Sequence, residues 1–259
     1  MIGQSVSHLD LAKREKLILS GLYLSKYDAG ALAKLGFDGF TEAFNVIGYA
    51  LGARPASVKN YRDEFDPLFP NRRAGWHKRP LREYCREVYE KYNHLDFETF
   101  TALIKSFFGL AQIESRNQPD SEERVGAIAS TFAQRLVTGQ AAERYFESAY
   151  LAIPEFQGCV LENTTQLGCG YDFCLRKESH WEDFFAVEVK GLNDSTGSIS
   201  MTEKEFQIAR SFRDRFFLFV AKNFRETPSH SLFRDPASCG LGFTKVERMV
   251  LQVSWSAKV

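Results

Sequence analysis

The sequence predicts an α+β or α/β protein in two parts. An all-helical, helix-turn-helix-like domain is expected over residues 1–122, and a mixed β-sheet core flanked by helices over residues 123–259. Before about residue 120, apolar residues recur at helical spacing, whereas after it short apolar runs of strand length alternate with helical segments. A polar, proline-containing stretch at residues 115–123 separates the two patterns and is typical of a linker or surface loop.

Four segments of the amino-terminal part show the apolar periodicity of amphipathic helices. We expect these helices over residues 9–24, 41–51, 81–92 and 97–110. A further helix is predicted to begin near Pro55, because proline suits the first helical turn, and Gly52 supplies a turn before it. The segments on either side of Gly52 therefore resemble a helix-turn-helix.

The carboxyl-terminal part is predicted to begin with a helix over residues 125–152, in which Gly139 is a candidate break. Strands are expected where short runs are rich in β-branched and aromatic residues. Their predicted ranges are 159–162, 171–176, 184–190, 216–221 and 248–255. Thr202 and Glu205 form a capping-box pattern that begins a helix ending near residue 213. Because this helix connects two of the strands, the sheet is expected to be mixed.

The overall composition disfavours several classes of protein. Lys and Arg total 33, as do Asp and Glu, so the net charge is zero and a purely electrostatic nucleic-acid coat is disfavoured. No apolar run approaches the ~18 residues that span a bilayer, and the first residues lack the hydrophobic core of a signal peptide. The five cysteines lack paired CxxC spacing, which favours reduced thiols over a zinc site. We therefore expect a protein of the bacterial cytosol with no membrane partner.

Three charged residues are expected to converge at one edge of the sheet. Glu188 and Lys190 are two apart in a predicted strand, so their side chains share a face, while Val187 and Val189 point into apolar packing. If this strand pairs as a hairpin with the preceding one, Asp172 lies opposite the same end. Carboxylates are ligands that Mg²⁺ prefers, and a neighbouring lysine can orient water and offset negative charge. We expect Asp172 and Glu188 to bind the metal and Lys190 to serve in catalysis.

This pattern resembles the PD-(D/E)xK nuclease superfamily, and most closely the restriction-associated domain also found at the carboxyl end of NO VEIN-type proteins. The shared features are Gly170-Tyr171-Asp172, Glu188-Val189-Lys190-Gly191, Thr202 with Glu205 at a helix start, and the strand Phe217-Leu218-Phe219-Val220. They cover roughly residues 139–225. Tyr171 stands where the superfamily name has proline.

The resemblance implies a restriction-endonuclease-like core and a type II-like restriction endonuclease that hydrolyses double-stranded DNA with Mg²⁺, for which Mn²⁺ is a possible substitute. Family members often place an additional acid on the helix before the core. Glu143 fills that position as a further catalytic or metal-binding residue, and Glu147, one turn later on the same face, is the competitor. A homodimer is expected, because cutting two strands requires two active sites. No Gly-rich phosphate loop occurs, so we expect no nucleotide cofactor.

Basic and polar residues in the amino-terminal part are candidates for DNA contacts. They follow Gly52 and extend through a locally basic stretch, with side chains suited to base edges or phosphates. The candidates are Arg54, Ser57, Lys59, Asn60, Arg62, Arg72, Arg73, Lys78 and Arg79. Trp76, within the same stretch, suits either base stacking or anchoring of the loop in the core.

Two other interpretations remain open at this point. One is a nuclease of another kind on the same core, such as a methylation-dependent or phage-defence nuclease or an RNase. The other is a DNA-binding regulator without catalysis, in which Lys190 forms only a salt bridge with a strand carboxylate.

Overall fold

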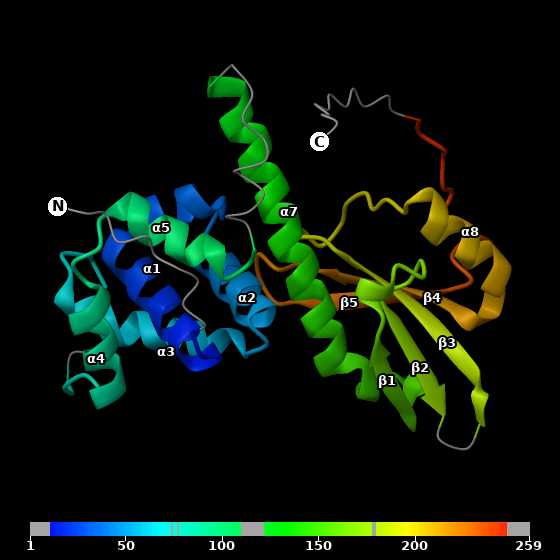
Figure 1. The fold of residues 1–259 in the computed structure, drawn as a ribbon, viewed down its shortest axis with the longest axis horizontal. Helices are drawn as coiled ribbons and strands as arrows, with labels where there is room; N and C mark the ends of the chain where they lie inside the picture. The colour runs from blue at the N-terminus through cyan, green and yellow to red at the C-terminus, as the bar shows by residue number, and fades with distance from the viewer. Residues whose placement is uncertain (1–10, 74, 77, 110–121, 178–179, 248–259) are drawn as a thin grey trace, which may run out of the picture.

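The computed structural model describes residues 11–73, 75–76, 78–109, 122–177 and 180–247, with side chains described for all of these except 122–134 and 180–182. Figure 1 shows a group of helices on one side of the long helix α7 and a β-sheet on the other, with α8 beyond the sheet. The α+β architecture with a helical amino-terminal part and a carboxyl-terminal mixed sheet is therefore confirmed.

The predicted helices of the amino-terminal part are present. Their bounds are α1 (Lys13–Leu35), α2 (Phe40–Ala50), α3 (Pro55–Phe65), α4 (Glu83–Tyr92) and α5 (Phe97–Ser106). Pro55 occupies the first turn of α3, as predicted. α1 continues past its predicted end, with a kink at Asp28, where φ is 49°. α1 and α3 cross closely, because a Cβ built on Gly21 would lie 2.5 Å from the Cβ of Tyr61.

The carboxyl-terminal part combines a long helix, five strands in one sheet and a shorter helix. Its elements are α7 (Glu122–Ala149), β1 (Cys159–Asn163), β2 (Phe173–Lys177), β3 (His180–Gly191), α8 (Glu203–Phe212), β4 (Phe216–Lys222) and β5 (Ser229–Arg234). The described strands lie in the order β1-β2-β3-β4-β5, and among them only β3 and β4 are parallel, joined by the crossover through α8. The predicted hairpin of β2 and β3 and the mixed sheet are thus confirmed.

Each face of the sheet packs against a different helix. On one face, Phe219 contacts Phe146 of α7, with ring centroids 4.8 Å apart. On the other face, Ala186 and Phe216 are fully buried beneath the α8 residues Ile208 and Phe212. The central strands β3 and β4 are therefore covered on both sides, as the apolar sequence of β4 predicted.

Three local predictions differ from the structure or lie outside it. Gly139 does not break α7, which continues through it to Ala149; a Cβ at this position would meet no other atom within 4 Å. The edge strand β5 was not predicted, because Ser229–Arg234 lacks an apolar alternation. The predicted strand at 248–255 lies outside the described residues, as does the predicted linker before Glu122.

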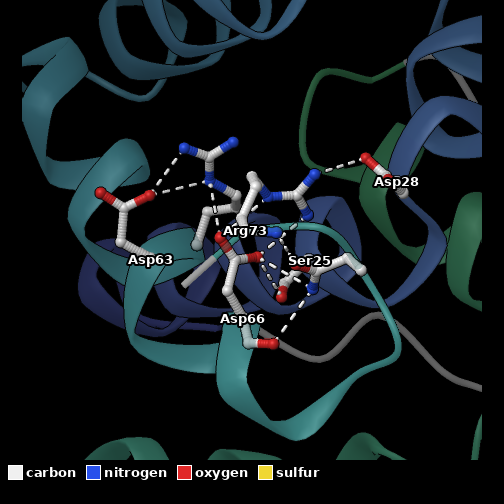
Figure 2. A network of polar contacts seen from close by, with 7 residues as sticks. Ser25, Asp28, Asp63, Asp66 and Arg73 are labelled. Atoms are coloured by element: carbon white, nitrogen blue, oxygen red, sulfur yellow. Dashed lines mark hydrogen bonds and ion pairs between the residues drawn. The ribbon is translucent and has the colours of Figure 1, made fainter. Parts of the chain in front are cut away.

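A network of buried charges holds the helical part together around Asp66 (Figure 2). The Asp66 side chain is 1% exposed, and it accepts hydrogen bonds from Ser25 Oγ at 2.7 Å and from Arg73 Nε at 2.9 Å. Arg73 also donates to Asp28 at 2.6 Å, at the kink of α1. Arg62 lies 3.5 Å from Asp66 and packs over the ring of Phe44. Asp66 therefore links α1 to the segment after α3.

The two parts of the chain share one buried interface. The Asn45 amide of α2 donates to the carbonyl oxygens of Phe224 and Glu226, both at 2.7 Å. The rings of Tyr49 and Tyr145 lie 5.2 Å apart, and buried residues of both parts form one continuous hydrophobic cluster. The helical part is thereby fixed against α7 and the sheet. In the described part of the chain, no helix has the length and apolar character needed to cross a membrane.

Candidate active site

Asp172 is held at the start of β2 by the end of the neighbouring strand. Its backbone N–H donates to the carbonyl oxygen of Val187 at 3.0 Å, and its Oδ2 accepts from the N–H of Val189 at 2.8 Å. The turn before it requires Gly170, where φ is +94° and a Cβ would lie 3.0 Å from Ile208. The carboxylate is therefore fixed beside β3.

Glu188 and Lys190 lie on the α8 side of β3, as their spacing predicted. Val187 and Val189, which alternate with them, belong to the core on the α7 side. Glu188 is 3% exposed, and the Lys190 ammonium donates a hydrogen bond to its Oε1. Two oppositely charged groups are thus bonded to each other at the end of β3 that Asp172 contacts through Val187 and Val189.

Glu205 joins this site from the first turn of α8. The Lys190 ammonium donates to Glu205 Oε2 at 2.9 Å, and the same oxygen accepts from the backbone N–H of Thr202 at 2.9 Å. The capping box of Thr202 and Glu205 is confirmed. The sequence reveals the capping role of Glu205 but not its bond to Lys190, because that bond depends on where α8 lies over β3.

Of the two candidate acids on α7, the structure brings Glu143 into electrostatic contact with the site. The charges of both Asp172 and Lys190 affect the pKa of Glu143. Glu147 instead forms an ion pair with Arg144 at 2.7 Å. Glu143 is therefore the α7 acid that is placed to act with Asp172.

The surroundings of this site disfavour the ionised form of three of its acids. Burial and the nearby Asp172 charge raise the pKa of Glu188 to about 8, and the same two causes raise the pKa of Glu143 to about 7. Burial also raises the pKa of Asp172, although the Val189 N–H and Lys190 oppose the shift.

Lys190 remains strongly basic and holds Glu205 ionised. Burial acts to lower the pKa of Lys190, but the bonded carboxylates of Glu188 and Glu205 outweigh it and raise the pKa. For Glu205, burial is likewise outweighed by the bond from Lys190, and its pKa is lowered. The arrangement is a buried ammonium among acids, of which Glu188 and Glu143 are the least favourably ionised.

These residues fall within a region that is similar to a known family. Residues 142–233 match the family model described as Protein NO VEIN, C-terminal. The match to NO VEIN includes the end of α7 and all five strands, and hence Glu143, Asp172, Glu188, Lys190 and Glu205. Comparison with curated proteins and with solved structures gives no match for the chain.

The donor set of the NO VEIN-like region suits a hard divalent cation. Asp172 and Glu188 supply carboxylate oxygens, Glu143 can add a third, and a cation would reduce the repulsion that raises their pKa values. Among the residues that the structure describes, no three His, Cys, Asp or Glu side chains are already gathered closely enough to hold a metal ion.

The candidate DNA-binding residues divide into two groups, both outside the NO VEIN match. Arg62 and Arg73 are engaged internally, because their guanidinium groups bond to Asp63, Asp66 and Asp28. Ser57 is half-buried in α3. The residues that remain exposed are Arg54, Lys59, Asn60, Arg72, Lys78 and Arg79.

Trp76 and Arg79 stack on each other in the loop after α3. The Arg79 guanidinium carbon lies 3.9 Å from the Trp76 ring centroid. The backbone N–H of Trp76 donates to the backbone carbonyl oxygen of Asp63 at 2.8 Å. This packing agrees with the interpretation that Trp76 anchors the loop rather than stacking on a base.

Proposed function

We propose that this chain is a metal-dependent endonuclease of the PD-(D/E)xK kind that hydrolyses phosphodiester bonds of double-stranded DNA. The observation that carries the proposal is the convergence of Asp172 with the Glu188–Lys190 pair at the end of β3. The match of residues 142–233 to the NO VEIN C-terminal model supports it, because that domain is linked to nucleases of this kind.

Each side chain has a role that follows from its environment. Asp172 and Glu188 would hold Mg²⁺, with Glu143 as a further oxygen ligand to the metal or to water. When bound, Mg²⁺ or Mn²⁺ polarises the phosphoryl group and lowers the pKa of a coordinated water. Lys190, kept protonated by its acidic neighbours, orients the water and offsets negative charge on the phosphate as the bond to the leaving oxygen breaks. Glu205 of α8 accepts a hydrogen bond from the Lys190 ammonium and so holds it in place.

A competing explanation treats the charges as a structural salt bridge. A structural salt bridge would pair Lys190 with an ordinarily ionised carboxylate, yet its ammonium bonds to both Glu188 and Glu205, and the pKa of Glu143 is raised to about 7 and that of Glu188 to about 8. Such an excess of buried acid destabilises the fold unless a cation binds. The excess therefore favours a catalytic site over a structural one.

We further propose that the enzyme is sequence-specific and acts as a type II-like restriction endonuclease. The helical part is docked rigidly against α7 and carries exposed basic residues, including Arg54, Lys59 and Arg72. It would recognise DNA while the sheet part cuts, and a homodimer would supply one active site for each strand.

A gel assay on a panel of nucleic acids tests the proposal. The purified protein is incubated in Mg²⁺ with unmethylated phage DNA, the same DNA after methylation, and a structured RNA. EDTA and Lys190→Ala serve as controls. We expect discrete DNA bands in Mg²⁺ that are absent from both controls.

The other outcomes assign the activity differently or remove it. Cutting confined to methylated DNA or to RNA would retain the nuclease and replace the type II-like specificity. No product from any substrate in Mg²⁺ or Mn²⁺ would contradict the proposal and favour a DNA-binding regulator.

A further inference from the structure

A basic groove lies where the helical part meets α7. It has a volume of about 1100 Å³ and is open to solvent. Its walls come from the start of α1, the turn between α2 and α3, and the last turns of α7. The groove is therefore formed only when the two parts of the chain are packed together.

The charged side chains that line this groove are mostly cations. Lys13, Lys16, Arg54 and Arg144 line it together with a single carboxylate, that of Glu147. Lys13 and Lys16 are three residues apart and so share one face of α1. In a chain whose net charge is zero, four cations against one acid make this a local site for an anion.

Two of these four cations form no ion pair within the described residues. Lys13 donates to the carbonyl oxygen of Gly52, and Arg144 is paired with Glu147. Within the described residues, neither Lys16 nor Arg54 forms an ion pair. The amino end of α3, at Arg54 to Ala56, also faces the groove and adds its partial positive charge.

The groove is connected to the candidate active site through α7. Arg144 and Glu147 line the groove, and both alter the pKa of Glu143, which also responds to Asp172 and Lys190. Charges in the groove and in the site are therefore within electrostatic reach of each other across a single helix.

We propose that the groove between α1, α3 and α7 binds backbone phosphates of the nucleic acid next to the scissile bond. Lys13, Lys16, Arg54 and Arg144 are the contacting residues. This inference rests on the proposed nuclease function and adds to it a positioning surface of which the sequence indicated only Arg54. An open groove with cations along two walls suits a continuous strand better than an enclosed small anion.

Binding without cleavage tests the groove separately from the chemistry. Fluorescence anisotropy of a labelled mixed-sequence DNA duplex is measured in EDTA over a series of salt concentrations. The variants are Lys16→Glu and Arg54→Glu, and the matched control is Lys177→Glu, an exposed lysine at the far end of β2. Melting temperatures of the three variants are measured first, so that a loss of binding is compared only between folded proteins.

We expect each groove variant to weaken binding about tenfold and to reduce the slope of log K against log salt by about 0.9, the value for one lost phosphate contact. Lys177→Glu should leave the slope unchanged. The proposal would be overturned if the groove variants bind the duplex as tightly as Lys177→Glu does. It would also be overturned if the protein binds a labelled mononucleotide more tightly than the duplex and the groove variants lose that binding. Because no metal is present, loss of duplex binding in the variants upholds the groove even for a protein that cuts nothing in Mg²⁺.

Discussion

In the helical part, the Asp66 carboxylate is nearly inaccessible to water and is bonded by Arg73, Ser25 and Asn71, with Arg62 beside it (Figure 2). In the sheet part, Glu188 is equally buried but has one cationic partner, Lys190, which it shares with Glu205. The first carboxylate has more donors than it needs, whereas the second has too few.

The difference separates a structural network from a functional one. Removing a well-satisfied buried charge leaves its partners unpaired and destabilises the fold. Neutralising a buried charge that has too few hydrogen-bond partners relieves repulsion and removes activity. Active sites commonly gain stability and lose function together in this way. The two networks should therefore respond in opposite ways to similar substitutions.

The largest effect is expected at Glu188. Glu188→Gln keeps the shape of the side chain but removes a metal ligand, so cleavage in Mg²⁺ should fall on the order of 100- to 1,000-fold. The free energy of unfolding should stay the same or rise by about 1 kcal/mol, because like charges are removed from a buried site. Cleavage rates and urea denaturation measure the two effects. Glu162→Gln, an exposed acid of the same sheet, should change neither; a Glu188→Gln protein that cuts normally would make this network structural.

Asp66 should show the opposite response. Asp66→Ala leaves Arg62 and Arg73 without their buried partner, so the free energy of unfolding should fall by about 3–5 kcal/mol. Urea denaturation gives the value directly. Asp214→Ala, which removes an exposed acid paired with Arg234, should cost less than about 1 kcal/mol. Equal losses in the two variants would contradict the structural role of Asp66.

Glu143 and Glu147 sharpen the boundary of the functional network. Glu143→Gln should slow cleavage about 10- to 100-fold, the range typical of residues that support a metal site, because Glu143 interacts with Asp172. Glu147→Gln should cut at the normal rate when the duplex is saturating, because Glu147 pairs with Arg144. A larger loss in Glu147→Gln than in Glu143→Gln would reverse the assignment.

The smallest effect separates the two roles of Glu205. Glu205→Gln should slow cleavage about tenfold by loosening Lys190, and it should leave stability nearly unchanged, because Gln also serves at the third helical position of a capping box. Thr202→Ala removes the cap while keeping the bond between Glu205 and Lys190, so it should lose stability without losing activity. If both variants lose activity equally, Glu205 acts only through the helix.

Local patterns were sufficient to predict much of the fold. The apolar run of β4, the capping box at Thr202 and the proline at the start of α3 each determine structure within a few residues. Neither Gly139 nor the edge strand β5 could be judged this way. Gly139 lies within α7, a helix that is stabilised by its packing against the rest of the protein. β5 is a strand because β4 offers an edge with which it can pair.

The candidate site shows the same limit. The spacing of Glu188 and Lys190 predicted their common face, and the hairpin predicted the approach of Asp172. The bond from Lys190 to Glu205, and the inward position of Arg73, depend on partners far along the chain. Only the packing of α8 over β3, and of α1 beside Asp66, brings those partners together.

The most direct test of the account compares two lysine substitutions in one cleavage assay. Wild type, Lys190→Ala and the exposed-lysine control Lys177→Ala are incubated with unmethylated phage DNA in Mg²⁺, after melting temperatures have shown that all three are folded. We predict that Lys177→Ala cuts like wild type and that Lys190→Ala gives no product. Cleavage by Lys190→Ala at the wild-type rate would contradict a catalytic site built from Asp172, Glu188 and Lys190.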